Sequence, residues 1–267
     1  MCGICGVVGL TPQGASVPFR RRAAASLARL RHRGPDEMHL ASCGEGAIGA
    51  TRLAIRGLES GSQPVVDPRT GVVVACNGEI DNHRELRAWL TGRGHSIPQE
   101  TDIAVIPALY LEHGESFPEH LVGAFAVAVW DPRVPRVVLA RDRAGEKPLF
   151  FTVRGDQVVF ASELAGLASD LDLPLEIDRD AIAGYLSRGC FLAPSTPFRG
   201  VSRVKPGEVV TIESGSVRSR RFWSLRFEAG SEAPPSEDAF DEVFRAAVAR
   251  QSDVAVPCGV FLSGGLD

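Results

Sequence analysis

The chain has 267 residues, of which 44% are apolar and 23% are charged, and its formal net charge is −4. This balance is typical of a globular protein with room for one large domain or two smaller ones. It offers no global basic field for nucleic acid, and no run approaches the ~18 consecutive apolar residues of a membrane span. The start lacks a basic region followed by an apolar core, so we expect no secretion signal.

Apolar runs with glycine or β-branched residues indicate buried strands along most of the chain. They lie at 3–10, 47–55, 72–80, 124–131, 136–142, 148–153, 157–162, 208–212 and 217–223. Helical spacing of apolar residues predicts helices at 19–30, 83–94, 102–114, 163–169, 180–187 and 236–251. Strands and helices come in blocks rather than in strict alternation, which favours an α+β fold with helices packed over antiparallel sheets.

The composition changes near residue 228. Residues 228–238 are polar and rich in proline and glycine, as in a linker. After the helix at 236–251, an apolar strand predicted at 258–262 runs into a Ser-Gly-Gly turn. We therefore expect one domain over 1–228 and the beginning of a second over 229–267.

Six cysteines are scattered along the chain, at positions 2, 5, 43, 76, 190 and 258. This spread predicts reduced thiols in the cytoplasm rather than a disulfide framework. Cys2 and Cys5 form a C-x-x-C, which suggests a redox pair or half a zinc site. No second C-x-x-C or H-x-x-x-H is present to complete a metal site, so no metal is expected. The simpler reading places Cys5 in a core as a small apolar residue.

Cys2 directly follows the initiator methionine. Methionine aminopeptidase removes Met1 when the next residue is small, which would leave Cys2 with both a thiol and a free α-amine. An α-amine has a pKa of about 7.7–8.0, so a fraction is neutral at pH 7 and can take the thiol proton. This is the arrangement of an N-terminal nucleophile. Taken alone, Cys2 is equally well an ordinary residue at the start of a strand.

An acyl-transfer site also needs donors for an oxyanion. Asn77 offers a side-chain amide and Gly78 a backbone N–H without a side chain to block approach. The alternative for Asn77-Gly78 is a plain turn at the end of a strand.

The charged ends of an amino-acid substrate need partners as well. Arg52 lies within a strand pattern and suits an α-carboxylate. Glu79 and Asp102 are available for an α-ammonium, although Asp102 fits a plain helix N-cap equally well.

Nine motifs stand in a fixed order along the chain: MCGICG, RHRGPDE, RLAI, GSQP, NGEIDNHREL, GAFAVAVWD, RDRAGEKPLFF, FASEL and FLSGGLD. Together they resemble the glutamine-hydrolysing asparagine synthetase family over nearly the whole chain. The resemblance implies a class II glutaminase domain, an αββα sandwich of the N-terminal nucleophile hydrolase type. It implies that the start of an α/β ATP-pyrophosphatase domain follows, truncated at the pyrophosphate loop.

The resemblance also implies roles for the candidate residues. Cys2 would attack the amide of L-glutamine, with Asn77 and Gly78 as the oxyanion hole. The substrate would be held by the side chains of Arg52, Glu79 and Asp102 and by the backbone of Leu53, Ala54 and Ile55.

The C-terminal turn resembles the pyrophosphate loop of an ATP site. The residues implied are Leu262, Ser263, Gly264, Gly265 and Asp267. Consecutive N–H groups in such a turn can cradle a phosphate, and the alternative is a tight turn between a strand and a helix. The family uses ATP, Mg²⁺ and aspartate, so we expect this chain to hold one complete site and the first loop of a second.

Two departures from the family pattern adjoin the pocket. The family usually has tyrosine where Asp81 stands, and often a Thr-Glu pair where this chain has Ile103 and Ala104. Relatives in other biosynthetic pathways amidate other carboxylates with the same front half, so the acceptor stays open. A non-catalytic glutamine-binding fragment is a further alternative, and a homodimer is also left open.

Overall fold

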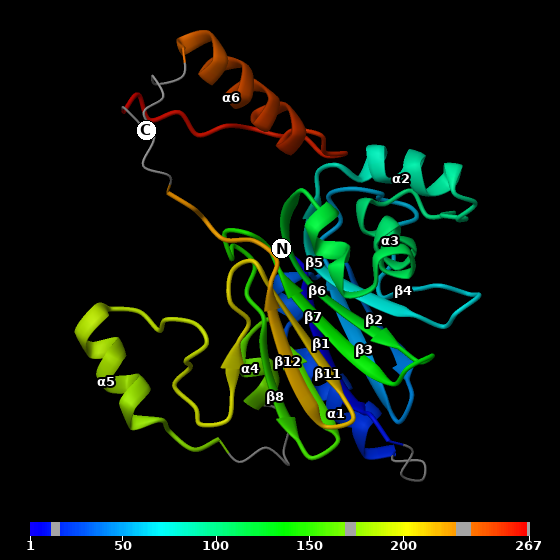
Figure 1. Ribbon diagram of the computed structural model, residues 1–267, viewed down its shortest axis with the longest axis vertical. Helices are drawn as coiled ribbons and strands as arrows, with labels where there is room; N and C mark the ends of the chain where they lie inside the picture. The colour runs from blue at the N-terminus through cyan, green and yellow to red at the C-terminus, as the bar shows by residue number, and fades with distance from the viewer. Residues whose placement is uncertain (12–16, 169–174, 228–235, 266–267) are drawn as a thin grey trace.

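The computed structural model describes residues 1–11, 17–168, 175–227 and 236–265. Two six-stranded antiparallel sheets pack face to face, and helices cover the outer face of each sheet (Figure 1). The expected αββα sandwich is therefore confirmed. None of the helices in the described ranges is long and apolar enough to cross a membrane.

The first sheet carries the N-terminal strand at its centre. Its order is β10 (Ser202–Arg203), β8 (Phe150–Arg154), β9 (Gln157–Ala161), β1 (Gly3–Gly9), β3 (Gly46–Arg52) and β2 (Glu37–Cys43). The second sheet is ordered β12 (Ser216–Arg221), β11 (Glu208–Glu213), β7 (Arg136–Arg141), β6 (Gly123–Asp131), β5 (Val73–Ile80) and β4 (Val65–Val66).

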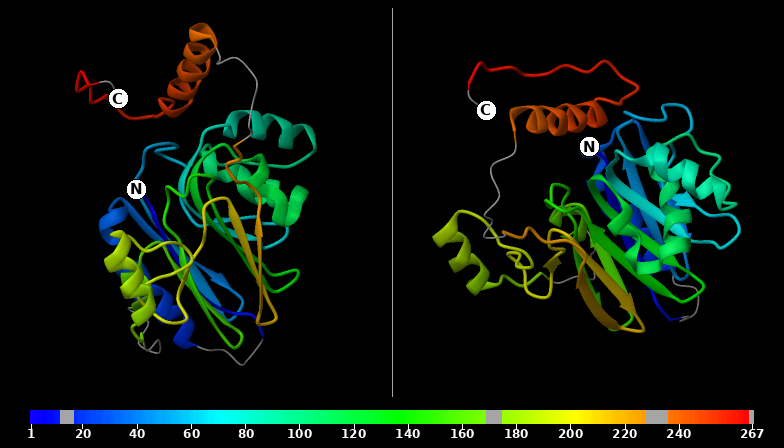
Figure 2. Two further views of the ribbon diagram at one scale, coloured as in Figure 1. Left: turned by 60° about the vertical axis from the view of Figure 1, so that its left-hand side comes forward. Right: turned by 45° about the horizontal axis from the view of Figure 1, so that its top comes forward.

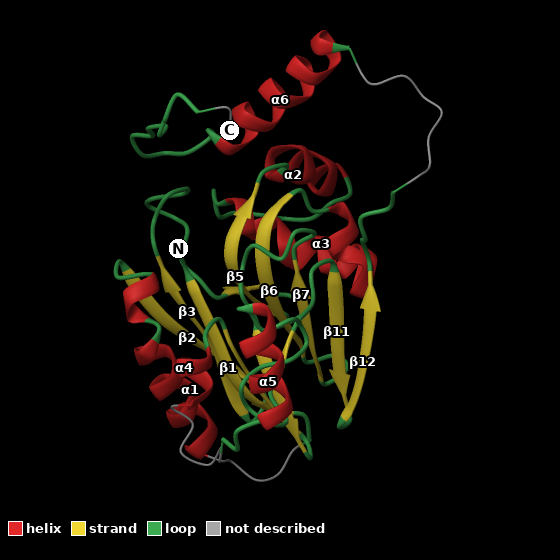
Figure 3. Ribbon diagram, turned by 90° about the vertical axis from the view of Figure 1, so that its left-hand side faces the viewer, coloured by secondary structure: helices red, strands yellow, loops and turns green. Residues whose placement is uncertain are grey.

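Helices α1 (Val17–Arg29) and α4 (Leu164–Ala168) contact the first sheet, and the short helix η1 (Arg31–Arg33) follows α1. The second sheet is covered by α2 (His83–Gly92), η2 (Asp102–Ala104), α3 (Val105–His113) and η3 (Gly114–His120) (Figure 3). Helices α5 (Arg179–Arg188) and α6 (Glu237–Gln251) stand apart from the sandwich (Figure 2).

The apolar core has three layers. The layer between the sheets includes Ile4, Ile48 and Phe160. The other two lie between a sheet and its helices, one under α1 and α4 and the other under α2 and α3. Central strands such as β1 are buried on both faces. Such strands read as near-continuous apolar runs, which is why their positions could be predicted.

The structure contains three strands that the sequence did not predict, the two-residue strands β4 and β10 and the longer β2. Strand β2 was not predicted, because its sequence EMHLASC lies at a sheet edge, is half exposed and has no continuous apolar run. The predicted strand at 258–262 is wrong, because these residues form no ladder with any described residue and Phe261 is fully exposed. An apolar run becomes a strand only when another backbone pairs with it.

Candidate active site

The structure places Cys2 directly before β1, at the end of the sandwich nearest the C-terminal segment (Figure 2). Ladders to β3 and β9 hold β1 on both sides. The Ile4 N–H donates to the Ser162 hydroxyl at 2.9 Å, and the Ser162 N–H donates to the Ile4 carbonyl at 2.8 Å. The candidate nucleophile is therefore attached to a rigid strand, which suits a reacting group that must keep a precise position.

The motif RHRGPDE wraps around the backbone next to Cys2. Arg33 Nε donates to the Cys2 carbonyl at 3.0 Å. Asp36 accepts from the Ala54 N–H at 2.8 Å. Gly34 lies so close to β3 that a Cβ on residue 34 would be 2.5 Å from the backbone nitrogen of Arg52. The motif thus fixes both Cys2 and the loop after Arg52, a role that the sequence reading did not assign to it.

The Cys2 thiol is partly buried and lies 3.9 Å from the carbonyl oxygen of Leu53. Burial raises the pKa of this thiol above its usual value, and the negative charges of Glu79 and Asp102 raise it further. The thiol is therefore protonated at neutral pH. A reaction through Cys2 requires a base that removes this proton.

Asn77 and Gly78 lie inside β5, paired with Ala126 and Phe125 of β6, so the alternative of a strand-end turn is wrong. Asn77 is fully buried, and neither atom of its amide has a hydrogen-bond partner among the described residues. Leaving such a buried group unpaired costs about 1–3 kcal/mol. A buried amide without a partner among the described residues is a candidate donor to a ligand.

Gly78 is required by the sheet itself. Its φ is +154°, and a Cβ there would lie 2.1 Å from the carbonyl oxygen of Ala124. Glycine at this position is therefore explained by packing against β6, independently of any role toward a substrate.

Arg52 is 4% exposed, and chain groups engage its guanidinium. Nη1 pairs with Glu37, and Nη2 donates to the carbonyl oxygens of Arg56 and Gly57. No partner is present for Nε among the residues that the structure describes.

Three carboxylates surround a second buried arginine, Arg56, which the sequence reading missed. Its guanidinium nitrogens lie 3.3 Å from Glu79, 3.3 Å from Asp81 and 3.9 Å from Asp102. A signal existed, because an arginine follows the apolar residues of RLAI and an aspartate replaces the usual tyrosine at 81. Each of these charges is costly when buried alone, and together Arg56 and Asp81 form an ion pair.

Asp102 is buried and accepts hydrogen bonds from the Ile80 N–H at 2.7 Å and the Thr101 hydroxyl at 3.1 Å. The alternative of a plain N-cap is therefore wrong. Burial and the charge of Asp102 raise the pKa of Glu79 to about 7, although Arg56 opposes the shift. The charge of Lys147, which lines the same cavity as Glu79, also opposes the shift, so the three carboxylates face two cations.

Two cavities flank Arg56, of about 370 and 290 Å³. Glu79 borders the first and Asp102 the second, and residues 251–255 help to line both. This segment is docked by a hydrogen bond from Ala255 N to the Ile55 carbonyl at 3.0 Å. The Ile55 carbonyl, one of the predicted pocket groups, thus contacts the segment after α6.

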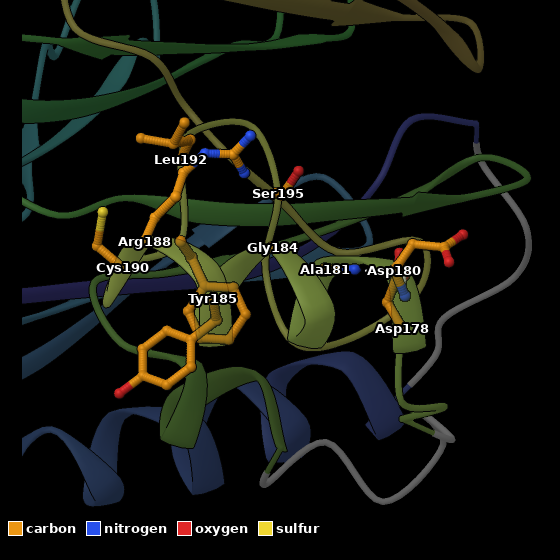
Figure 4. A pocket seen from close by; sticks show the side chains of 10 residues that line it. Asp178, Asp180, Ala181, Gly184, Tyr185, Arg188, Cys190, Leu192 and Ser195 are labelled. Carbon is orange, nitrogen blue, oxygen red and sulfur yellow. Dashed lines mark hydrogen bonds between the residues drawn. The ribbon is translucent and has the colours of Figure 1, made fainter.

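The predicted phosphate loop does not join these residues. Leu262 to Gly265 are exposed, and within this stretch a hydrogen bond runs from Gly265 N to the Ser263 hydroxyl at 3.2 Å. Asp267 lies outside the described residues. A further hollow of about 230 Å³ lies along α5, lined by Tyr185, Arg188 and Leu192 among others (Figure 4). None of the predicted site residues lines it.

Comparison with known proteins gives two family matches. Residues 1–223 match the model described as "Glutamine amidotransferase domain", and residues 239–267 match "Asparagine synthase". The chain is 32% identical over 277 aligned positions to asparagine synthetase [glutamine-hydrolyzing] 3 of Bacillus subtilis, covering 100% of the chain and 44% of that protein. It is 34% identical to asparagine synthetase [glutamine-hydrolyzing] of Asparagus officinalis, covering 100% of the chain and 40% of that protein. The chain thus spans less than half the length of these relatives.

Two solved structures share the fold. Glutamine phosphoribosylpyrophosphate amidotransferase from B. subtilis, in complex with ADP and GMP, superposes with a TM-score of 0.59 at 22% identity, over 84% of this chain and 50% of that one. A structure titled as the allosteric regulatory enzyme of purine biosynthesis gives a TM-score of 0.61 at 22% identity, with the same coverage. These neighbours confirm the sandwich of the N-terminal nucleophile hydrolase type.

Proposed function

The chain belongs to the family of glutamine amidotransferase domains, and we propose that it hydrolyses glutamine to glutamate and ammonia with Cys2 as the nucleophile. The observation that carries the proposal is the buried amide of Asn77, which has no hydrogen-bond partner among the described residues and lies two residues before Glu79, whose charge acts on the Cys2 thiol. A substrate oxyanion would supply the partner that this amide lacks.

The reaction follows from the protonated state of the thiol. Removal of Met1 gives Cys2 a free α-amine, which takes the thiol proton. The sulfur then adds to the side-chain amide carbon of glutamine, while Asn77 Nδ2 and the Gly78 N–H stabilise the oxyanion. The amine returns the proton to the departing ammonia. Water hydrolyses the thioester, which releases glutamate and restores the thiol.

The charged ends of glutamine would be held by opposite charges of the chain. Arg52 would bind the α-carboxylate, and the backbone of residues 53–55 would line the pocket. Glu79 and Asp102 would bind the α-ammonium. The charge balance supports this role, because three carboxylates face two cations, Arg56 and Lys147.

For a protein of the relatives' length, we propose that the ammonia amidates a carboxylate activated by ATP and Mg²⁺, with aspartate as the first candidate acceptor. The support is the second family match, which begins at residue 239 and includes Leu262, Ser263, Gly264, Gly265 and Asp267 of the suggested phosphate loop. Another carboxylate is the alternative. All six cysteines are free thiols in the structure, which supports action in the reducing cytoplasm.

The test is to incubate the purified chain with glutamine and to measure glutamate and ammonia. We expect equal amounts of both, no product from Cys2→Ala, and unchanged activity from Cys258→Ala, which alters an exposed thiol. If Cys2→Ala binds glutamine and hydrolyses it as fast as the unaltered chain does, Cys2 is not the nucleophile.

A further inference from the structure

Both ends of the proposed glutamine pocket already contain an ion pair made by the chain itself. Arg52 pairs with Glu37, and Arg56 pairs with Glu79 and Asp81. Neither Glu37 nor Arg56 was among the predicted site residues. Each has the charge that one end of glutamine would bring.

At the first end, Glu37 takes the part of Arg52 that a ligand needs. Two carbonyl oxygens accept from Nη2 of Arg52 and Glu37 accepts from Nη1, so a carboxylate that takes a second donor besides the open Nε competes with Glu37 for Nη1. Glu37 is itself fixed by the Ser62 hydroxyl at 3.0 Å. Burial would raise the pKa of Glu37, but the hydrogen bonds from Arg52 and Ser62 outweigh it and lower the pKa, so the carboxylate is charged.

At the second end, Arg56 spans the carboxylates proposed for the α-ammonium. Its side chain is 8% exposed and lies 3.3 Å from Glu79 and 3.9 Å from Asp102. Its Nε and the nearby Glu79 Oε2 have no well-formed hydrogen bond among the described residues. The contact with Glu79 is therefore an ion pair without a directional bond, which a second cation can share. Hydrogen bonds to the Ile80 carbonyl at 3.2 Å, to Asp81 at 3.3 Å and to the Arg250 carbonyl at 3.4 Å hold the guanidinium, and a cation that displaces Arg56 must replace them.

We propose that Glu37 and Arg56 are internal counterions that take the places of the α-carboxylate and the α-ammonium of glutamine until the substrate binds. This inference rests on the proposed function. Each counterion neutralises the charge that would attract one end of the substrate, so glutamine must share or displace it. The charged ends do not change during the reaction, so the counterions raise KM and leave kcat unchanged.

A purely structural role makes a different prediction. If Glu37 only neutralises a buried arginine, its removal leaves Arg52 unpaired and lowers stability, with no gain in substrate binding. The two roles are separated by substrates that lack one charged end each. Glutarate monoamide keeps the carboxylate of glutamine without the ammonium, and 4-aminobutanamide keeps the ammonium without the carboxylate.

The experiment compares KM and kcat of Glu37→Gln and Arg56→Met for glutamine and for these two amides. Glu37→Gln should lower KM roughly 3- to 10-fold for glutamine and glutarate monoamide and leave 4-aminobutanamide unchanged. Arg56→Met should lower KM by a similar factor for glutamine and 4-aminobutanamide and leave glutarate monoamide unchanged. Glu112→Gln, which breaks the remote pair with Arg93, is the matched control and should alter none of them.

Arg56→Met leaves three carboxylates with one cation fewer and risks poor folding. The double variant Arg56→Met/Asp81→Asn removes one charge of each sign and should show the same pattern across the three amides. Calorimetry of glutamine binding in a Cys2→Ala background gives a second readout that needs no hydrolysis. There both counterion variants should tighten binding roughly 3- to 10-fold.

A rise in KM, or an equal change for all three amides, would overturn the counterion proposal while leaving the glutaminase intact. Absence of hydrolysis by the unaltered chain, with no glutamine binding by Cys2→Ala, would instead overturn the proposed function and the counterion proposal with it.

Discussion

Arg33 Nε donates a hydrogen bond to the carbonyl oxygen of Cys2 at 3.0 Å, while Nη1 of the same side chain pairs with Glu163 at 2.7 Å. The side chain of Arg33 is 9% exposed. One guanidinium therefore joins the residue proposed as nucleophile to the loop that follows β9. The geometry needs the planar fork of arginine, because a lysine ammonium cannot serve both acceptors in these directions.

Arg33→Lys should accordingly lower kcat for glutamine hydrolysis about tenfold, since a small misplacement of a reacting group is costly. Steady-state kinetics with a thermal melt would separate misplacement from unfolding. The control is His32→Ala, because His32 contacts the same Glu163 from an exposed position. Equal losses in the two variants would contradict the positioning role.

Asn77→Ala should lower kcat by roughly 10²–10³, as expected for loss of one oxyanion donor, with little change in KM. Asn82→Ala provides a comparison, because Asn82 donates to the His120 carbonyl in a partly exposed turn. A normal kcat for Asn77→Ala would remove Asn77 from the mechanism.

Glu79 predicts a pH dependence of stability. Its pKa is raised to about 7 from an ordinary value of 4.5, first by burial and then by Asp102. Between these values the folded state binds more protons than the unfolded state, so stability falls as pH rises from about 4.5 to 7. Because the side chain is partly solvated, the loss should be on the order of 1 kcal/mol, or roughly 2–4 °C in Tm.

Glu79→Gln removes this titration, so the variant should gain stability relative to the unaltered chain above pH 7 and lose the advantage near pH 4.5. Thermal melts of both proteins across this range provide the measurement. Parallel curves at every pH would show that Glu79 titrates normally.

An N-terminal extension should abolish hydrolysis, because Cys2 then has no free α-amine and its thiol stays protonated. The same extension at the other end of the chain should be harmless to hydrolysis. Mass spectrometry confirms the mature terminus, and a glutaminase assay follows. Full activity with a retained extension would require a different base.

The sequence predicts the sandwich well because most strands are buried on both faces and therefore carry dense apolar runs, as in β1 and β6. The edge strand β2 lacks this signal. The segment at 258–262 has the signal without a partner strand in the described part of the chain. Apolar composition reports the tendency to be buried, whereas strand formation depends on another backbone.

The candidate site was predicted unevenly for a similar reason. Arg52, Asn77 and Asp102 are polar residues inside or next to apolar runs, and all three are buried. Glu37 lies in a polar stretch and Arg56 directly follows an apolar run, and their importance comes from contacts with residues distant in sequence. Such pairings appear only once the chain has folded. The roles of the predicted residues toward glutamine, and the boundary near residue 228, stay predictions.

Covalent labelling tests the central claim most directly. The chain is incubated with an electrophilic glutamine analogue, with and without excess glutamine, and the adduct is located by peptide mass spectrometry. We predict one adduct, on an N-terminal Cys2, that glutamine suppresses, and no reaction at Cys190 or Cys258 although both are exposed. An adduct on another cysteine, or labelling of Cys2 that glutamine does not reduce, would contradict the assignment of Cys2 as the glutaminase nucleophile.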